Sequence, residues 1–255
     1  MMTSDTLPCR PLVVLAFLAV GTLLSDPLWS QEGARPLPEE RGKGILEQFD
    51  RRLREVETLL AAGESRKAYK KVSRVLDEMT DRFISGPDVG RFLGVALVQR
   101  AVAAYQLGRT DEAIWHWYVA RQMLPEVAGL QMTAYGAAGT FLKTQSIRHA
   151  LATLHWTPGS AEELEGGGTP PRKIRAPMPE LPAAKRGFSR VSVELEVIIG
   201  ENGRLREPLI LDSKGELTLV YATLDTLRRW EFQPAEIKGK PAAVRYKLVF
   251  NFRSE

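Results

Sequence analysis

Apolar residues recur at three- and four-residue spacings through the first half of the chain. The clearest run consists of Ile45, Phe49, Leu53, Val56, Leu59 and Leu60, with arginines and glutamates between them. That spacing is typical of an amphipathic helix with one buried stripe. Similar spacing continues to about Ala152, so the pattern predicts an all-α domain over residues 44–152.

Two segments of this region share one arrangement of small residues around a glycine turn. The sharper copy is Ala96–Glu126, with Leu97 and Ala101 on a first helix, Gly108 in the turn, Ala113, Trp117 and Ala120 on a second helix, and Pro125 at its end. In the earlier copy Gly63, Ala68, Val72 and Val75 hold equivalent places. Small residues at these points let two antiparallel helices approach closely. The segments resemble tetratricopeptide repeats.

The repeat differs from that family in its spacing. Ala68 and Ala113 are 45 positions apart, whereas the usual period is about 34 residues. We therefore expect Phe83–Phe92 to form an inserted loop or a helix extension. A third, degenerate unit is expected from Leu130 to Ala152, where Gly136 and Gly139 weaken the helical pattern.

The concave face of such repeats usually binds peptides, and the expected register points Gln99, Arg100 and Ala103 toward it. Trp117 is assigned to packing between the helices, which leaves Trp115 and Tyr118 as the more exposed candidates for an aromatic ligand patch. Packing in the core or between repeats is the favoured interpretation for these aromatics, and a ligand patch is the alternative. His116, between the two tryptophans, is expected to pack or to face solvent and not to bind a metal.

After the helical region the period changes from about four to two. Val191, Val193, Leu195, Val197 and Ile199 alternate with mostly polar neighbours, as in a strand with one buried face. Gly200–Gly203 is the expected turn, residues 204–212 the return strand, Leu217–Leu227 a helix, and Val244–Phe252 a last alternating strand. Ser213 and Glu216 have the spacing of a helix capping box. The order predicts a helix packed on an antiparallel sheet, so the whole chain is expected to be a multi-domain α+β protein.

Residues from about Pro171 to Phe252 resemble the C-terminal domain of TonB, the periplasmic energy-transducing family. The resemblance rests on a proline-rich lead-in, on "VSVELEVIIGENGRLREPLIL", on a helix ending "LRRWEFQPA", and on "KGKPAAVRYKLVFNF". It implies a protein-binding domain spanning residues 183–255.

The resemblance also implies how a partner binds. An extended peptide pairs with an exposed sheet edge, and backbone hydrogen bonds supply the affinity. The candidate residues are those of the last strand, namely Tyr246, Lys247, Leu248, Val249, Phe250, Asn251 and Phe252. Their aromatic side chains are expected chiefly to fill the core beneath the helix, with Lys247, Asn251 and Arg253 flanking the partner.

The remaining segments are predicted to be an export signal and linkers. Residues 1–30 carry Arg10, an apolar run over 12–24 and a small residue, Ser30, which together are typical of a signal peptide. That run is shorter than the roughly 20 residues of a spanning helix, so a short membrane anchor is the alternative. Residues 31–43 are a polar linker, and 153–182 are a Pro/Gly-rich linker between the domains. The single cysteine, Cys9, precedes the apolar run, so a mature chain would contain no disulfide.

Composition excludes several function classes. The net charge of +4 is too small to indicate nucleic-acid binding. The three histidines lack metal-ligand spacing, and no phosphate loop, dinucleotide fingerprint or Gly-x-Ser-x-Gly is present. We expect no enzyme, no cofactor and no metal.

The sequence therefore predicts a non-enzymatic periplasmic protein of a Gram-negative-type bacterium, which binds protein partners and is linked to TonB-dependent outer-membrane transport. Outer-membrane receptor peptides and other envelope proteins are the expected partners, and membrane contact is expected only if the N-terminal segment is uncleaved. Two alternatives stay open: a single-pass inner-membrane energy transducer, and an envelope scaffold without a transport role.

Overall fold

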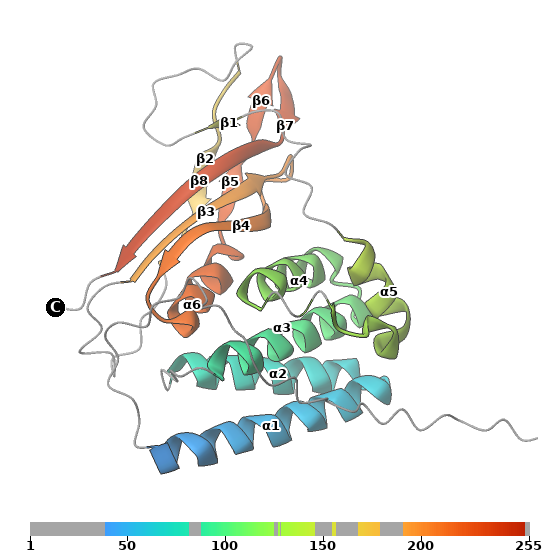
Figure 1. Ribbon diagram of the computed structural model, residues 1–255. Coiled ribbons are helices and arrows are strands. Elements are labelled where there is room, and N and C mark those ends of the chain that lie inside the picture. Colours follow the sequence, from blue (N-terminus) through green and yellow to red (C-terminus); the bar gives the residue numbers. More distant parts are fainter. Residues whose placement is uncertain are drawn as a thin grey trace, which may run out of the picture.

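A computed structural model describes residues 39–81, 88–124, 127, 129–145, 155–156, 168–178 and 191–252. The predicted signal peptide and most of both predicted linkers lie outside these residues, as does the first half of the expected insertion Phe83–Phe92; its last four residues are helical. Within the described part, a stack of helices lies under a twisted sheet, and one further helix fills the space between them (Figure 1).

The helical region begins earlier than the sequence predicts. The first helix, α1, spans Glu39–Ala61 and so includes the end of the predicted linker 31–43. It is followed by α2 (Ser65–Asp81), α3 (Val89–Gln106), α4 (Thr110–Met123), the 3-10 helix η2 (Met132–Tyr135) and α5 (Gly136–Thr144). The last two elements fall in the expected third unit, whose remaining residues are not described.

The two predicted helix pairs are present and turn in the same way. Gly63 and Gly108 both have φ of +75°, a backbone conformation that glycine adopts without strain. In each turn the residue after the glycine donates its N–H to a carbonyl five residues earlier, at 2.9 Å. Ala68 and Ala113 are fully buried at equivalent places on the following helices. The internal repeat of 45 positions is therefore a repeat in structure as well.

The main sheet has the strand order β1-β8-β3-β4. Its long strands are β3 (Val191–Ile199), β4 (Leu205–Lys214) and β8 (Val244–Phe252), and β3 in the middle is antiparallel to both of its neighbours. Helix α6 (Leu217–Leu227) covers the inner face of the sheet, confirming the predicted helix-on-sheet arrangement. The predicted capping box is wrong: Ser213 belongs to β4, and Glu216 precedes the helix without a side-chain cap.

Part of the predicted interdomain linker 153–182 belongs to the sheets. Strand β1 (His155–Trp156) pairs in parallel with the start of β8. Strand β2 (Arg172–Arg175) pairs with β5 (Glu231–Gln233), next to the small hairpin of β6 (Ala235–Ile237) and β7 (Lys240–Ala242). Main-chain polarity explains the difference, because a proline-rich segment still carries carbonyls and N–H groups that a neighbouring strand can satisfy.

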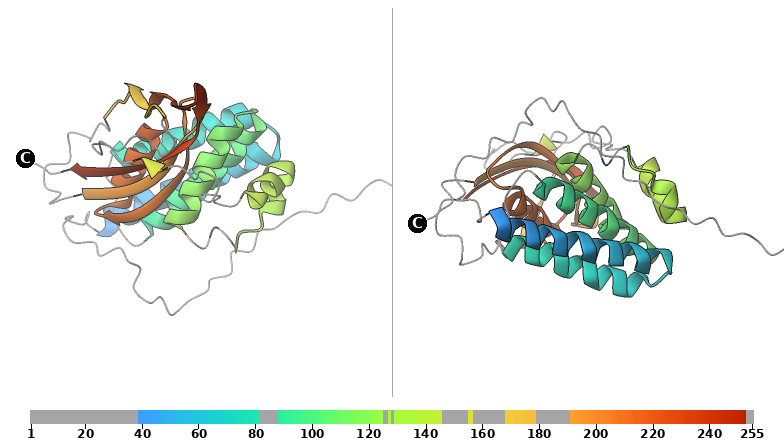
Figure 2. Two further views of the ribbon diagram at one scale, coloured as in Figure 1. Left: turned by 90° about the horizontal axis from the view of Figure 1, so that it is seen from above. Right: turned by 60° about the horizontal axis from the view of Figure 1, so that its bottom comes forward.

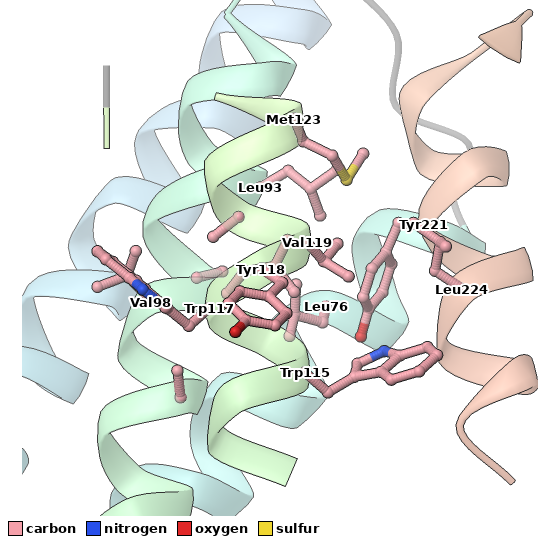
Figure 3. Packing of buried hydrophobic residues seen from close by; sticks show 14 of the residues in the cluster. Leu76, Leu93, Val98, Trp115, Trp117, Tyr118, Val119, Met123, Tyr221 and Leu224 are labelled. Carbon is pink, nitrogen blue, oxygen red and sulfur yellow. The ribbon is translucent and has the colours of Figure 1, made fainter. Parts of the chain in front are cut away.

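The helices and the sheet share one hydrophobic core. Helix α6 lies on the sheet with one side and against α2, α3 and α4 with the other (Figures 1 and 2). Trp115 of α4 lies beside Tyr221 and Leu224 of α6 (Figure 3). Trp115 and Tyr118 are both buried, in agreement with the favoured packing interpretation and not with an exposed ligand patch. The docking of the C-terminal domain contributes to this burial, since it covers a helix face that would otherwise meet water.

The turn between β3 and β4 offers a test of this packing. Gly203 has φ of +72°, and a Cβ there would lie 1.9 Å from the carbonyl oxygen of Phe232. Gly108 has the same kind of φ but open space around it. We expect Gly108→Ala to lower the free energy of unfolding by about 1–2 kcal/mol, the cost of the left-handed backbone alone. Gly203→Ala should cost at least about 2 kcal/mol more, as the backbone must shift. Urea denaturation of both variants measures the difference; equal losses would contradict the close approach.

Candidate protein-binding edge

The predicted binding strand, β8, alternates between core and surface. Tyr246, Leu248 and Phe250 are buried under the sheet, while Lys247 and Asn251 are exposed and Val249 is 54% exposed. The predicted core role is confirmed for Tyr246 and Phe250, which pack against Phe232 and Trp230 at ring-centroid distances of 5.5 and 5.8 Å. Burial raises the pKa of Tyr246 to about 12. The side chain of Phe252 is outside the described residues.

The backbone of β8 is regular along its whole length. It pairs one-to-one with β3 from Val191↔Phe252 to Ile199↔Val244, without a bulge, and it contains no proline. On its other edge β1 pairs only with Arg245 and Tyr246. The edge from Lys247 to Phe252 therefore has no strand neighbour among the described residues, and a strand edge of this kind can accept another chain.

Ion pairs fix the exposed face of the same strand. Lys247 lies 2.5 Å from Glu194, and Arg245 lies 3.8 Å from Glu196, both across the β3–β8 pair. Both pairs join β8 to its neighbour β3, so they hold the long cationic side chains over the sheet and away from the outer edge of β8. A chain approaching β8 in the plane of the sheet can therefore reach the backbone.

The opposite edge of the sheet, formed by β4, is closed in three ways. A bulge interrupts its pairing with β3 near Glu207, whose φ is +53°, and Pro208 has no N–H to offer. Gln122 of α4 then occupies the edge: its side-chain amide donates to the carbonyl of Pro208 and accepts from the N–H of Ile210, both at 2.6 Å. One glutamine side chain thus makes the two hydrogen bonds that a neighbouring strand would make.

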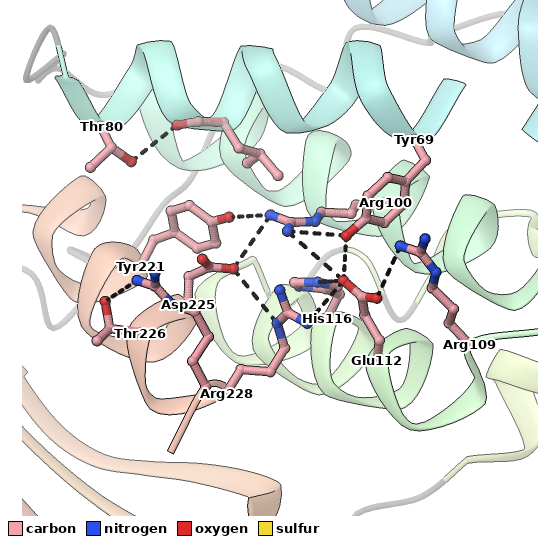
Figure 4. Close-up of polar contacts among 12 residues, drawn as sticks. Tyr69, Thr80, Arg100, Arg109, Glu112, His116, Tyr221, Asp225, Thr226 and Arg228 are labelled. Atoms are coloured by element: carbon pink, nitrogen blue, oxygen red, sulfur yellow. Dashed lines mark hydrogen bonds and ion pairs between the residues drawn. The ribbon is translucent and has the colours of Figure 1, made fainter. Parts of the chain in front are cut away.

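A buried polar cluster joins the helices to α6 just below this edge (Figure 4). Arg100 of α3 donates to the hydroxyl of Tyr221 at 2.8 Å and lies 3.4 Å from Asp225, both on α6. Glu112 of α4 lies 3.1 Å from Arg228, the residue that follows α6. Because a buried charge is tolerated only with such partners, this cluster fixes how the two domains fit together.

The cluster also shifts the pKa of its titratable groups. Burial alone would raise the pKa of Glu112, but hydrogen bonds from His116 and Tyr69 and the charge of Arg228 lower it to about 2. Burial, aided by the positive charge of Arg100, lowers the pKa of His116 to about 4. Glu112 is therefore ionised and His116 neutral near pH 7, which confirms that His116 packs in the interior.

The three residues predicted to line the repeat groove do not face the same surface. Gln99 lines a groove of about 480 Å³ between α1 and α3, whose floor includes Leu53 and Phe92. Arg100 points instead into the interdomain cluster, and Ala103 is fully buried. Adjacent positions on a helix point about 100° apart, so only one of the first two can face the groove.

Sequence reasoning missed Gln122 and misassigned Arg100. Their partners, Ile210 and Tyr221, are 88 and 121 positions away. Neither residue belongs to a short motif. The one available signal was an arginine within the otherwise apolar and small-residue stretch "VALVQRAVAA", which indicates a buried cation in need of a partner.

The strand edge, its flanking helix and the sheet order can be compared with known proteins. Residues 182–254 match the family described as Gram-negative bacterial TonB protein C-terminal. The C-terminal domain is TonB-like. The matched residues run from before β3 through α6 to the end of β8, so they contain both edges described above. No curated protein matches the chain.

The described residues include neither a membrane-spanning helix nor a cluster of metal-binding side chains. None of the helices in the described ranges combines the length and apolarity needed to cross a membrane. Within those ranges, histidine, cysteine and carboxylate side chains do not gather in a group that could hold a metal ion.

Gln122 can be tested by removing its amide while keeping its length. We expect Gln122→Met to leave the Pro208 carbonyl and the Ile210 N–H without their partner, at about 1–3 kcal/mol for each group that stays dry. Urea denaturation measures the loss of stability. Gln48→Met, at an exposed position of α1, is the matched control; equal behaviour of the two variants would contradict the closure of β4.

His116 predicts a specific acid sensitivity. Its pKa is about 4 in the folded protein against an ordinary value of 6.5, so the unfolded chain binds a proton first as pH falls. The free energy of unfolding should drop by about 3 kcal/mol from this group between pH 6.5 and 4, and no further below. Denaturation at a series of pH values should show the drop in the wild type and a smaller one in His116→Gln. An equal pH dependence of both proteins would contradict the prediction.

Proposed function

We propose that this chain is a non-enzymatic protein-binding protein of the Gram-negative cell envelope, whose TonB-like domain binds a partner by strand pairing along Lys247–Phe252. The partner class is an extended segment of an outer-membrane transport protein. The match of residues 182–254 supports the link to such transport. The periplasm is the proposed location.

The observation that carries this proposal is the contrast between the two edges of the sheet. Natural sheets protect their edges with bulges, prolines or covering elements, and β4 has all three. On β8, by comparison, the segment beyond Tyr246 is long and regular and has no proline. Among the described residues, the β8 edge has no covering strand, whereas β4 is protected by a bulge, a proline and a side chain. This contrast is expected if β8 pairs with a partner strand.

The helical domain has a supporting role in this proposal. It packs against α6 and β4 on the side of the sheet away from β8, as Figure 1 shows, so it leaves the binding edge accessible. We also propose that its two helix pairs are tetratricopeptide-like. Their matching glycine turns and buried alanines support this, and the groove lined by Gln99 would then be a secondary peptide site.

A photocrosslinking experiment tests the strand-pairing site. A benzoylphenylalanine residue introduced at Val249, which is 54% exposed beside the open edge, should crosslink to a TonB-dependent outer-membrane receptor in living cells. The matched position is Leu211 of β4, which is 46% exposed on the closed side and should give no such product. Mass spectrometry of the purified adducts identifies the partner.

Three results would contradict the proposal: a receptor adduct from position 211 as strong as that from position 249, adducts only with cytoplasmic proteins, or no adduct from either position.

Hydrogen exchange provides a second test of the binding strand once a partner peptide is known. Backbone amides of Lys247–Phe252 that face the open edge should then become protected, while those of β4 should not change.

A further inference from the structure

One end of the C-terminal domain exposes apolar and cationic side chains together. Of the described residues, Ile174 and Met178 are the most exposed large apolar side chains, at 69% and 64%. They flank Arg175 in a stretch, residues 168–178, that contains no carboxylate. Single exposed apolar residues are common. Here, however, two of them lie in one short stretch that also contains three cations, and such a patch needs an explanation.

The backbone presents Ile174 by an irregularity in the strand. Arg172 pairs with Gln233, Lys173 with Phe232, and Arg175 with Glu231, so Ile174 is left over as a bulge. A bulge re-aims side chains and costs one pair of the ladder. Here the bulge lies at an exposed isoleucine between two cations, Lys173 and Arg175. Lys173 is held back over the Trp230 ring, 4.9 Å from its centroid, which anchors β2 to the core.

The neighbouring hairpin adds two more cations at the same end. Thr169 and Glu236 exchange backbone hydrogen bonds of 2.8 and 3.0 Å, which tie the start of this stretch to the β6–β7 hairpin. The turn of that hairpin exposes Lys238 and Lys240. Residues 168–178 and 231–242 together carry five cations against two carboxylates, Glu231 and Glu236. Glu231 is already paired with Arg204 at 2.8 Å.

These residues lie along one ladder, which runs from Pro177, whose carbonyl accepts from Trp230 just after α6, to the projecting β6–β7 hairpin (Figure 1). We call the exposed cationic and apolar side chains of this ladder the basic end, made up of Arg172, Ile174, Arg175, Met178, Lys238 and Lys240. We propose that the basic end docks on the surface of an anionic phospholipid bilayer, with Ile174 and Met178 entering the headgroup region. The cations bind lipid phosphates, and the two apolar side chains leave water.

Charge and shape favour a bilayer over a soluble anionic polymer. Cationic side chains alone are enough to bind a soluble anionic polymer, so such a partner does not explain why Ile174 is exposed on a bulge. At an anionic membrane each lysine or arginine adds attraction, and apolar side chains that enter the interface add more. The proposal stands apart from strand pairing by β8. It also departs from the sequence-based expectation that membrane contact requires an uncleaved N-terminus.

Vesicle flotation of the full chain tests the proposal. Wild type should float with vesicles containing phosphatidylglycerol and bind at least about tenfold more weakly to phosphatidylcholine alone, with the difference lost at high salt. Arg172→Glu with Arg175→Glu should weaken phosphatidylglycerol binding at least about tenfold. Ile174→Ser should weaken it about three- to tenfold without a change in charge. Insertion of the apolar run 12–24 does not need an anionic headgroup, so the difference between the two lipids isolates the basic end.

The control carries the same charge change elsewhere. Arg51→Glu with Arg66→Glu, at exposed positions of α1 and α2, should bind as the wild type does, and circular dichroism checks that all variants fold. Equal binding to both lipids, or an equal loss in the control, would overturn the proposal. So would an unchanged Ile174→Ser variant, or retention on heparin by a protein that no vesicle binds.

Discussion

Helix α6 is buried on both sides, and the architecture depends on that burial. One side of α6 covers the sheet. The other side faces the helical domain, where Tyr221 and Asp225 contact Arg100, and Arg228, just after the helix, contacts Glu112. Separating the two domains would expose apolar surface on both, and docking them in a different register would leave Arg100 or Glu112 as a buried charge without its partner. The penalty for an unpaired buried charge is several kcal/mol, so the polar cluster makes the fit specific, while the apolar contacts around Trp115 and Leu224 supply most of the attraction.

The same docking decides which parts of the sheet are accessible. Once α6 holds the sheet against the helices, α4 lies along β4, and Gln122 reaches the backbone of that strand. β8 is then the strand farther from α4, with β3 between it and β4. A closed edge on β4 and an edge of β8 without a strand neighbour among the described residues therefore follow from one choice of packing face.

Local patterns in the sequence predicted local structure well. The period-two runs gave β3 and β8, the glycine turns gave the helix pairs, and the residues around Trp230 and Phe232 pointed to the domain that the family match confirms. Features that depend on long-range contacts were missed. Arg100 was assigned to a groove, since nothing nearby in the chain indicates Tyr221 as its partner. The strands β1 and β2 lay in a stretch whose prolines and glycines are typical of a linker, yet their backbone pairs with elements far along the chain.

The buried second face of α6 has a consequence for where this protein can be divided. The family match begins at residue 182, after β1 and β2, and includes none of the helices that cover α6. The segment that matches the family is therefore smaller than the unit that buries its apolar surface. Cutting the chain at residue 182 would expose one face of α6 to water, so substitutions on that face are constrained by α2, α3 and α4.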